Sequence, residues 1–561
     1  MKTINGLHPL QKDFVHLNEL FAEIFQRYGS APAFGHLGAE ISYSQLDRLT
    51  RRFAAWLQLN TPLKPGDRLA VQLPNLMQYP LVLIAALRAG LVLVNTNPLY
   101  TADELLTQLK DSGAKAIVAF TPLAQPLSEI IAETDIHTVI LAQLGDLHGW
   151  KGGLVNQILR WKKPYPPAHW PAHLNPIQLS ELLKQPLEHH WVAPSIQTQD
   201  LALLQYTGGT TGTAKAAMLT HANLLANLQQ ISELLESYIT PGRERLLQPL
   251  PIYHVYAFML SLSLFSFGSR CELVPNPRDI PGLAKLFQRY KPTFFAGINP
   301  LFNALLQNDL FKKLNFSDLR ITISGGMALS PALAEQWALI TGCDIAEGYG
   351  LTECSPVVSV NPPDQTELGS VGPLLSRTQV EIRDEQRQNL PQGAVGEIWV
   401  KGPQVMLGYW QQTEETRRVL GEDGWLDTGD IGCFTDSGRL KIIDRSKEVI
   451  SVSGFKVYPT ELENVVNAMP DVMECAAIGL PDEHHGEKIK LYVIPRHAQV
   501  SAEEIRNYCR ERLTAYKIPK CIEFCDSLPR TPVGKVLRRA LRQQALEKIT
   551  RAPKTPVQTR D

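Results

Sequence analysis

The stretch from Tyr206 to His221, Tyr-Thr-Gly-Gly-Thr-Thr-Gly-Thr-Ala-Lys-Ala-Ala-Met-Leu-Thr-His, decides how the rest of the chain is interpreted. It follows an apolar run of strand type, Leu201–Tyr206, and precedes apolar residues at helical spacing, with Thr220 as the expected N-cap. Glycines let backbone N–H groups approach an anion, threonines add hydroxyl donors, and Lys215 supplies positive charge. This strand–loop–helix pattern predicts a phosphate-binding loop. A flexible Gly/Thr turn is the alternative.

The loop departs from the Walker pattern, in which Gly-Lys is followed by Ser or Thr. Thr213 and Ala214 separate Gly212 from Lys215, and Ala216 follows the lysine. The loop therefore counts against an ordinary P-loop kinase or ATPase and indicates a different nucleotide chemistry.

Composition sets broad limits on the class of protein. A chain of 561 residues has room for more than one domain, and a net charge of −1 gives no reason to expect nucleic acid as a partner. The eight cysteines form no C-x-x-C pair, and no signal peptide is recognisable, so we expect reduced thiols in the cytoplasm. The apolar stretches Leu81–Val94 and Val255–Ser269 fall short of the roughly 20 residues that cross a bilayer.

The order of apolar patterns predicts an α/β fold with two domains. From Asp67 onward strand and helix patterns alternate, which is typical of mostly parallel sheets covered by helices, with a β-rich portion near Val371–Val400. We expect this large mixed α/β domain at residues 1–443 and a small α+β domain at 444–548. In the small domain, Thr460-x-x-Glu463 and Ser501-x-x-Glu504 predict two capped helices. Residues 549–561 are expected to be a disordered tail.

The segment Trp150–Lys163 combines aromatic and basic residues. Trp150, Leu154, Ile158 and Trp161 can share one helical face, and several lysines and an arginine add positive charge. Such a stretch is typical of a helix on an anionic membrane surface. An ordinary surface helix that packs this apolar face on the domain is the alternative.

Four further segments can be explained singly as turns or hairpin tips. They are Ser324–Met327, Gly348–Glu353, Asp423–Asp430 and Pro529–Lys535. Taken together with the loop and Asp444-Arg445, in this order, they resemble the adenylate-forming superfamily of acyl-CoA synthetases, luciferases and peptide-synthetase adenylation domains. Four other stretches are similar to bacterial long-chain fatty acid–CoA ligases: Asn97–Thr101, Asn276–Pro281, Gly402–Trp410 and Ser453–Pro459.

This resemblance implies a set of ATP-binding residues. The β- and γ-phosphates would be bound by Thr207, Gly208, Gly209, Thr210, Thr211, Gly212 and Lys215. Adenine and ribose would be held by Gly325, Gly326, Gly348, Tyr349, Gly350, Asp430 and Arg445. Glu353 and Thr207 would hold Mg²⁺, and Thr352 would bond the adenylate phosphate. Lys535 would bridge the attacking carboxylate and the α-phosphate.

The resemblance also implies a second half-reaction with coenzyme A. A mobile small domain would rotate about a hinge at Asp444 and Lys447, and Gly454 would line the pantetheine channel. His254 matches a family position beside the acyl carboxylate, although a hydrogen-bonded core histidine is the alternative. Ala216 stands where glycine is usual, and it would be strained if φ were positive there.

The expected protein is thus a fatty acid–CoA ligase with ATP, coenzyme A and a medium- to long-chain fatty acid as substrates. It would be cytoplasmic and peripheral on the inner membrane if Trp150–Lys163 binds lipid. Two other hypotheses are an adenylating enzyme whose acceptor is a carrier-protein phosphopantetheine, and a non-catalytic nucleotide or lipid sensor. The presence of Lys535, Glu353 and Asp430 counts against the sensor.

Overall fold

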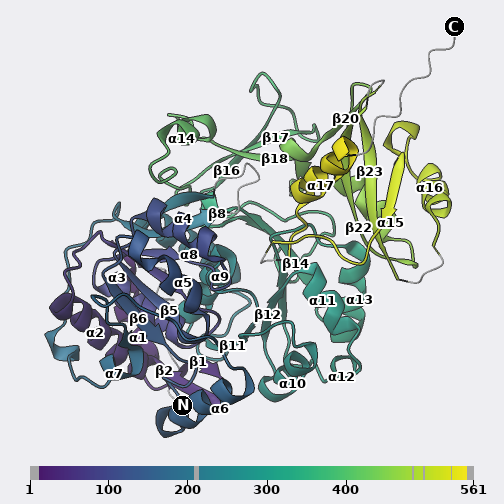
Figure 1. Ribbon diagram of the computed structural model, residues 1–561. Coiled ribbons are helices and arrows are strands. Elements are labelled where there is room, and N and C mark those ends of the chain that lie inside the picture. The colour runs from purple at the N-terminus through teal and green to yellow at the C-terminus, as the bar shows by residue number, and fades with distance from the viewer. Residues whose placement is uncertain are drawn as a thin grey trace. The chain divides into compact units, whose positions relative to one another are not determined.

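A computed structural model of the chain describes residues 10, 12–207, 214–482, 485–496, 500–531 and 534–551. The chain forms two compact units, which we call the large unit and the small unit (Figure 1). The large unit comprises residues 1–379 and 400–426, and the small unit comprises residues 380–399 and 427–561. The α/β class expected from the sequence is confirmed.

A seven-stranded sheet of the large unit carries the predicted phosphate loop at one edge. Its order is β7-β6-β5-β3-β4-β8-β9, and the strands run parallel except β9, which is antiparallel to β8. The inner strands β4, β5 and β6 are mostly buried apolar runs, as expected where helices cover both faces. Their bounds are β3 (Arg68–Gln72), β4 (Val92–Asn95), β5 (Ala116–Phe120), β6 (Thr138–Ala142), β7 (Ile177–Gln178), β8 (Leu201–Thr207) and β9 (Lys215–Thr220).

An eight-stranded sheet of the large unit has the order β15-β14-β13-β12-β10-β11-β1-β2. Its central strands are parallel, and the edge strands β2 and β15 are antiparallel to their neighbours. The strands are β1 (Pro32–His36), β2 (Ala39–Ser42), β10 (Arg245–Gln248), β11 (Arg270–Leu273), β12 (Phe294–Gly297), β13 (Ile321–Ser324), β14 (Ile345–Gly350) and β15 (Val357–Val360).

Helices cover the sheets of the large unit (Figure 1). One core lies where α10–α13 pack on the eight-stranded sheet, with the fully buried Trp337 stacked on Phe295 of β12. The helices are α1 (Leu17–Tyr28), α2 (Tyr43–Asn60), α3 (Gln78–Arg88), α4 (Ala102–Ser112), α5 (Gln125–Ile130), α6 (Gly152–Lys162), α7 (Leu179–Leu182), α8 (His221–Leu235), α9 (Val255–Ser266), α10 (Ile280–Tyr290), α11 (Asn299–Leu306), α12 (Asp309–Lys312), α13 (Pro331–Thr341) and α14 (Thr413–Val419). Within the described ranges, no helix is long and apolar enough to cross a membrane.

The strand–loop–helix prediction around the phosphate loop needs one correction. The loop is followed by strand β9 and only then by helix α8. Strand β9 forms because it pairs with β8 on one side, while on the other side Met218 exchanges backbone hydrogen bonds with residues 407 and 408. Thr220 does cap α8, since its side chain accepts a hydrogen bond from the Asn223 N–H.

The described residues of the small unit form two sheets. A four-stranded sheet has the order β16-β17-β18-β19, and a five-stranded sheet has the order β21-β20-β23-β22 with β24 beside β23. The strands are β16 (Gln379–Arg383), β17 (Gly396–Lys401), β18 (Leu426–Phe434), β19 (Leu440–Arg445), β20 (Ile450–Val452), β21 (Phe455–Val457), β22 (Val472–Asp482), β23 (Gly486–Pro495) and β24 (Cys521–Phe524). The helices are α15 (Pro459–Asn467), α16 (Ala502–Arg510) and α17 (Arg538–Arg551).

The two predicted capping boxes have different outcomes. Ser501 caps α16, and the Glu504 carboxylate accepts from the Ser501 N–H at 2.7 Å, as predicted. The box at Thr460 and Glu463 is wrong, because α15 already begins at Pro459 and has no side-chain cap.

The predicted division of the chain differs from the compact units. The four-stranded sheet lies largely before Asp444, yet it belongs to the small unit. Helix α17 continues to Arg551 and so includes the first residues of the predicted tail; residues 552–561 lie outside the described residues.

Candidate active site

The described ends of the phosphate loop are Thr207 and Lys215, which face each other on β8 and β9. The Thr207 hydroxyl donates to the Lys215 carbonyl oxygen at 3.3 Å and holds the two strand ends together. The other predicted phosphate ligands lie outside the described residues: Gly208, Gly209, Thr210, Thr211 and Gly212.

Lys215 of the large unit lies among acidic and aromatic side chains. Its ammonium is 2.5 Å from a Glu415 carboxylate oxygen and 5.2 Å from the centre of the Tyr409 ring. The Tyr409 hydroxyl donates to Glu353 Oε1 at 2.7 Å. Burial raises the pKa of Tyr409, and the Glu353 carboxylate raises it further, so this hydroxyl stays a donor. Tyr409 therefore joins the loop lysine to the predicted metal ligand.

Glu353 and Thr352 form part of a short 3₁₀ turn, η6 (Thr352–Cys354), which packs against β8 and β9. The Glu353 carbonyl oxygen accepts from the Met406 N–H at 2.7 Å, which fixes the turn on residues that run beside β9. The structure thus brings Thr207, Lys215 and Glu353 to one edge of the seven-stranded sheet. Glu415 and Tyr409 are functional candidates without a predicted role; only the stretch Gly402–Trp410 signalled one of them.

The two glycine segments predicted for adenine lie on neighbouring parallel strands. Gly325 and Gly326 follow β13, and Gly348 to Gly350 end β14. A Cβ on Gly325 would lie 3.3 Å from the Tyr256 ring and 3.6 Å from the Gly348 carbonyl oxygen, so the segments are close. At Gly350 a Cβ would lie 2.1 Å from the Pro356 carbonyl oxygen, a distance that excludes any side chain.

His254 precedes α9 and lies near the same strand ends. Its Nδ1 accepts from the Tyr256 N–H at 3.4 Å, and the Tyr256 hydroxyl donates to the Ile323 carbonyl oxygen of β13. Burial lowers the pKa of His254 to about 4, so the ring is neutral at neutral pH. With Nδ1 accepting, the proton is on Nε2, which makes this nitrogen a donor. His254 can therefore accept from the Tyr256 N–H through Nδ1 and still donate from Nε2 to a carboxylate.

In the small unit, Asp430 and Arg445 are cross-strand partners on β18 and β19. Arg445 Nε is 2.8 Å from Asp430 Oδ1, and Asp430 is 3% exposed. The guanidinium orients the carboxylate that was predicted to accept the ribose hydroxyls.

Lys535 follows a turn in which its own N–H donates to the Thr531 hydroxyl at 3.1 Å. Across the described part of the chain its ammonium has no hydrogen bond or ion pair. Burial lowers the pKa of Lys535, and the Arg445 cation lowers it further, while Glu448 and Asp430 act in the opposite direction. Lys535 is therefore an unpaired cation close enough to Asp430 and Arg445 to feel their charges.

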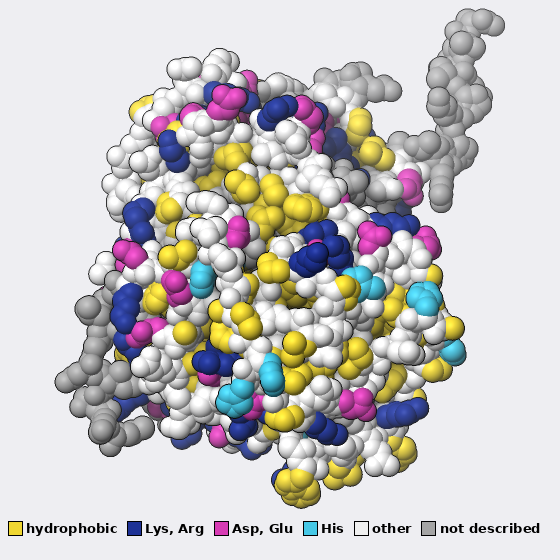
Figure 2. Space-filling view, turned by 90° about the vertical axis from the view of Figure 1, so that its left-hand side faces the viewer, with side chains coloured by type: hydrophobic (Ala, Val, Ile, Leu, Met, Phe, Trp, Pro, Cys, Tyr) yellow, Lys and Arg dark blue, Asp and Glu magenta, His cyan; other side chains and the backbone are white. Residues whose placement is uncertain are grey.

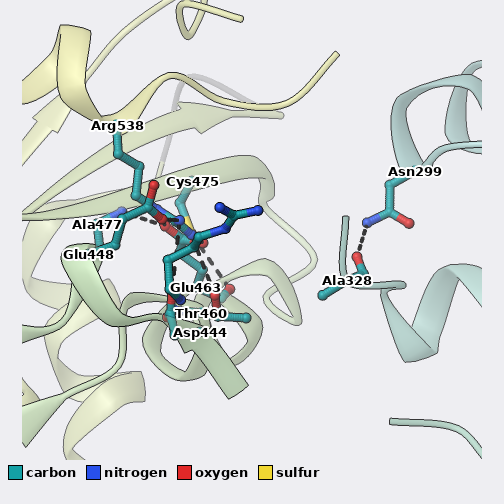
Figure 3. Close-up of polar contacts among 10 residues, drawn as sticks. Asn299, Ala328, Asp444, Glu448, Thr460, Glu463, Cys475, Ala477 and Arg538 are labelled. Carbon is teal, nitrogen blue, oxygen red and sulfur yellow. Dashed lines mark hydrogen bonds and ion pairs between the residues drawn. The ribbon is translucent and has the colours of Figure 1, made fainter. Parts of the chain in front are cut away.

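Asp444, the predicted hinge residue, is held by the rest of the small unit. It is 5% exposed and accepts from the Arg445 and Thr460 N–H groups at 2.8 Å each. Arg538 lies among acidic side chains beside it (Figure 3), bonding Glu463 through Nε at 3.0 Å and Nη2 at 2.6 Å, and also pairing with Glu448. This pairing explains the wrong capping box, because Glu463 turns inward to Arg538.

The other predicted residues of the small unit are exposed. Lys447 lies in the turn η7 (Ser446–Glu448), where its side chain is exposed. Gly454 has a φ of 84° between β20 and β21, a conformation that favours glycine. Next to it, Phe455 is 55% exposed and stacks on Tyr516.

Ala216 is not strained. It lies in β9 opposite Tyr206, is fully buried, and is absent from the described residues with positive φ. The glycine-to-alanine departure is therefore compatible with the loop.

Comparisons with known proteins identify the family of the chain. Residues 21–410 match the AMP-binding enzyme family, and residues 461–535 match the AMP-binding enzyme C-terminal domain. The chain is 45% identical over 534 residues to a long-chain-fatty-acid–CoA ligase of Yersinia pestis, covering 95% of this chain and 94% of that protein. A ligase of the same name from Escherichia coli O6:H1 is 44% identical over 537 residues, covering 95% of each chain.

Among solved structures, ATP-bound MatB from Rhodopseudomonas palustris has a TM-score of 0.81 and 29% identity, covering 94% of this chain and 98% of that one. Two family matches and near full-length relatives thus agree with the order of motifs along the sequence. The chain belongs to the AMP-binding enzyme family and, within it, to the bacterial long-chain fatty acid–CoA ligases.

Proposed function

We propose that this protein is an ATP-dependent ligase that converts a medium- to long-chain fatty acid to its coenzyme A thioester. In the first step the carboxylate attacks the α-phosphate of ATP, an acyl-AMP forms and pyrophosphate leaves. In the second step the coenzyme A thiol attacks the acyl carbonyl, and AMP leaves. The observation that carries the proposal is the junction of Lys215, Tyr409 and Glu353 beside the loop.

The chemical difficulty of the first step is electrostatic. A fatty carboxylate is ionised at neutral pH and needs no general base, but it must approach a phosphate that is also negative. Lys215 would exchange Glu415 for phosphate oxygens, and Thr352 would bond the adenylate phosphate. Lys535 would lie between carboxylate and α-phosphate, which suits a cation without a carboxylate partner of its own. His254 would donate from Nε2 to the acyl carboxylate.

The family resemblance implies two groups of residues that would hold the nucleoside. Gly325, Gly326 and the segment 348–350 would leave a flat space for adenine, bordered by Tyr349. Asp430, oriented by Arg445, would accept the ribose hydroxyls. These roles rest on the family resemblance and on the local geometry of each unit.

Mg²⁺ is the expected cofactor, and the residues present suit it. Glu353 offers a carboxylate and Thr207 a hydroxyl, both hard oxygen donors, and Mg²⁺ in nucleotide sites takes few protein ligands. When bound, the ion would supply positive charge that neutralises phosphate oxygens.

Coenzyme A would enter after pyrophosphate leaves. We assign the hinge to Asp444 and Lys447 and the pantetheine channel to Gly454, which itself carries no side chain. Rotation of the residues after the hinge, expected at 444–548, would withdraw Lys535 between the two steps. The acyl chain length is set by tunnel depth, and one methylene contributes only about 1–3 kcal/mol of discrimination.

The test is a fatty-acid panel assayed with ATP and Mg²⁺, first without and then with coenzyme A. We expect fatty-acid-dependent pyrophosphate release, followed by AMP and acyl-CoA when the thiol is added. Glu353→Gln should strongly lower pyrophosphate release, whereas Glu335→Gln, an exposed site on α13, should not. No release with any fatty acid would favour a sensor. Acyl-AMP that does not react with free coenzyme A would favour a carrier-protein acceptor.

We further propose that the protein is cytoplasmic and contacts an anionic membrane surface peripherally. A membrane would concentrate the apolar substrate near the enzyme. The exposed Trp150, just before α6, and Trp161, within α6, support this location.

A further inference from the structure

The outward side of α6 is an exposed apolar stripe. Trp150, just before the helix, is 88% exposed, Trp161 is 81%, Leu154 is 58% and Ile158 is 43%. At 3.6 residues per turn these positions fall on one narrow face. Figure 2 shows hydrophobic side chains protruding at the lowest edge of the view, which is the level of α6 in Figure 1.

Helix α6 packs on the large unit through its opposite side. Gly152 is buried, and a Cβ there would lie 2.2 Å from the Gly145 carbonyl oxygen, so the two backbones touch. The Gly145 N–H donates to Asn156 Oδ1 at 2.7 Å and fixes the rotation of the helix. The alternative in which the Trp-bearing face packs on the domain is therefore wrong. The tryptophans lie on the side opposite these contacts and therefore point away from the core.

The charge around this stripe has one sign. Between Asp146 and Glu181 the sequence contains no acidic residue, while it contains Lys151, Arg160, Lys162 and Lys163. None of these cations has a carboxylate partner among the described residues. The Lys151 ammonium lies 5.3 Å from the centre of the Trp150 ring, so charge and aromatic surface are presented together.

A pocket of about 400 Å³ lies along the flank of α6. It is lined by Asn156, Gln157 and Arg160 of the helix, by Tyr165 and Trp170 of the proline-rich segment that follows, and by Gln143 after β6. The pocket is thus at the carboxyl ends of parallel strands, a common place for ligands. Its lining offers amide, guanidinium, phenol and indole donors and no carboxylate, which suits an anion attached to an apolar body.

We propose that α6 and this pocket form a docking site for an anionic phospholipid bilayer. The stripe of Trp150, Leu154, Ile158 and Trp161 enters the interface, the lysines lie at the headgroup level, and the pocket with Arg160 takes one phosphate-bearing headgroup. This inference rests on the proposed peripheral membrane contact and names the surface and the lipid chemistry. Long basic side chains and tryptophans at one interface are the usual combination for such a helix.

The test is cosedimentation of the full-length protein with vesicles of phosphatidylcholine alone or of phosphatidylcholine mixed with phosphatidylglycerol, whose negative headgroups charge the surface. Wild type should pellet with the anionic vesicles and less as salt rises. Removing both tryptophans (W150S and W161S together) should weaken partitioning at least about tenfold. Changing Lys151, Lys162 and Lys163 to Gln should weaken it about fivefold for each lysine, on anionic vesicles only.

Matched variants separate this surface from general effects. Leu339→Ser, at an 86% exposed site on α13, and the pair K285Q and K313Q, at exposed sites, should leave partitioning unchanged. Soluble glycerol phosphate should compete with the vesicles for the wild type. It should not compete for Arg160→Gln, which should keep the salt-dependent binding. Competition by inorganic phosphate alone would mean an adventitious anion site. Equal pelleting of wild type and the tryptophan variant would overturn the proposal. Fatty-acid-dependent pyrophosphate release by the same samples tests the ligase separately, because neither outcome depends on the other.

Discussion

Lys535 and Arg538 are neighbouring cations of the small unit with opposite surroundings. Arg538 is bonded to Glu463 and Glu448 and lies 4.0 Å from Asp444. Burial alone would lower the pKa of Arg538, but Glu463 and the other carboxylates raise it above the ordinary value. Lys535 has no such partner among the described residues, and burial lowers its pKa.

Arg538 has the surroundings of a structural cation, whereas Lys535 has those of a cation that can bind a reacting anion. A buried charge without a partner is costly unless an anion arrives to bind it, whereas a paired charge is neutralised inside the fold. Arg538 joins α17 to α15 and to the segment around Asp444. It therefore fixes the position of the residues that follow Lys535. Arg538 therefore stabilises the fold, whereas Lys535 has the surroundings that the proposed interaction with the reacting anions requires.

The largest expected effect is on stability. Arg538→Ala leaves Glu463 and Glu448 without their cation, and breaking a buried ion pair costs about 3–5 kcal/mol. Hydrogen exchange of the β22 amides, which pack against α15 and α17, reports this on the small unit alone.

Arg542→Ala is the matched control on the same helix. Arg542 pairs with Glu487 at 2.7 Å but is 44% exposed, so its loss should cost less than about 1 kcal/mol. Similar protection in both variants would remove the structural half of the comparison.

Lys535→Ala should have the next largest effect, on the rate of adenylation. Loss of one key electrostatic contact lowers a rate by about 10²–10³-fold. Thioester formation from supplied acyl-AMP should be largely spared, and β22 exchange should be unchanged. Single-turnover assays of each half-reaction measure this, with Lys441→Ala, an exposed lysine on β19, as the control. Equal losses in both half-reactions would contradict the division of labour.

The pH dependence of adenylation should be a smaller but directional effect. In its proposed role Lys535 acts as a cation, and it loses its charge as pH rises through its pKa. Because burial lowers that pKa, adenylation should fall at a lower pH than for an ordinary lysine, which titrates near 10.4. Lys535→Arg should abolish the alkaline fall, since arginine stays charged. A fall that persists in Lys535→Arg would assign it to another group.

Local sequence patterns were sufficient to predict helices and strands whose decisive contacts are made by residues near one another in the chain. Strand β8 begins at the predicted Leu201 and helix α8 begins after the predicted N-cap Thr220, because period and caps are local. Tyr409 and Glu415 received no role because their partner Lys215 is distant in sequence: Glu415 comes 200 positions after Lys215. Strand β9 was missed because its pairing with residues 407–410 depends on the tertiary fold. The order of motifs predicted the family, but the exposure of the α6 stripe came only from the structure.

The two capping boxes give the smallest and most discriminating test. Ser501 caps α16, so Ser501→Ala should cost about 0.5–2 kcal/mol and weaken protection of the α16 amides. Thr460→Ala should cost less, since α15 begins at Pro459 and the Thr460 hydroxyl makes only a 3.5 Å contact with Arg538. Exchange of the two helices in the two variants measures both. If Thr460→Ala exposed α15 as strongly as Ser501→Ala exposes α16, Thr460 would be a cap after all, and Glu463 would serve that cap rather than Arg538.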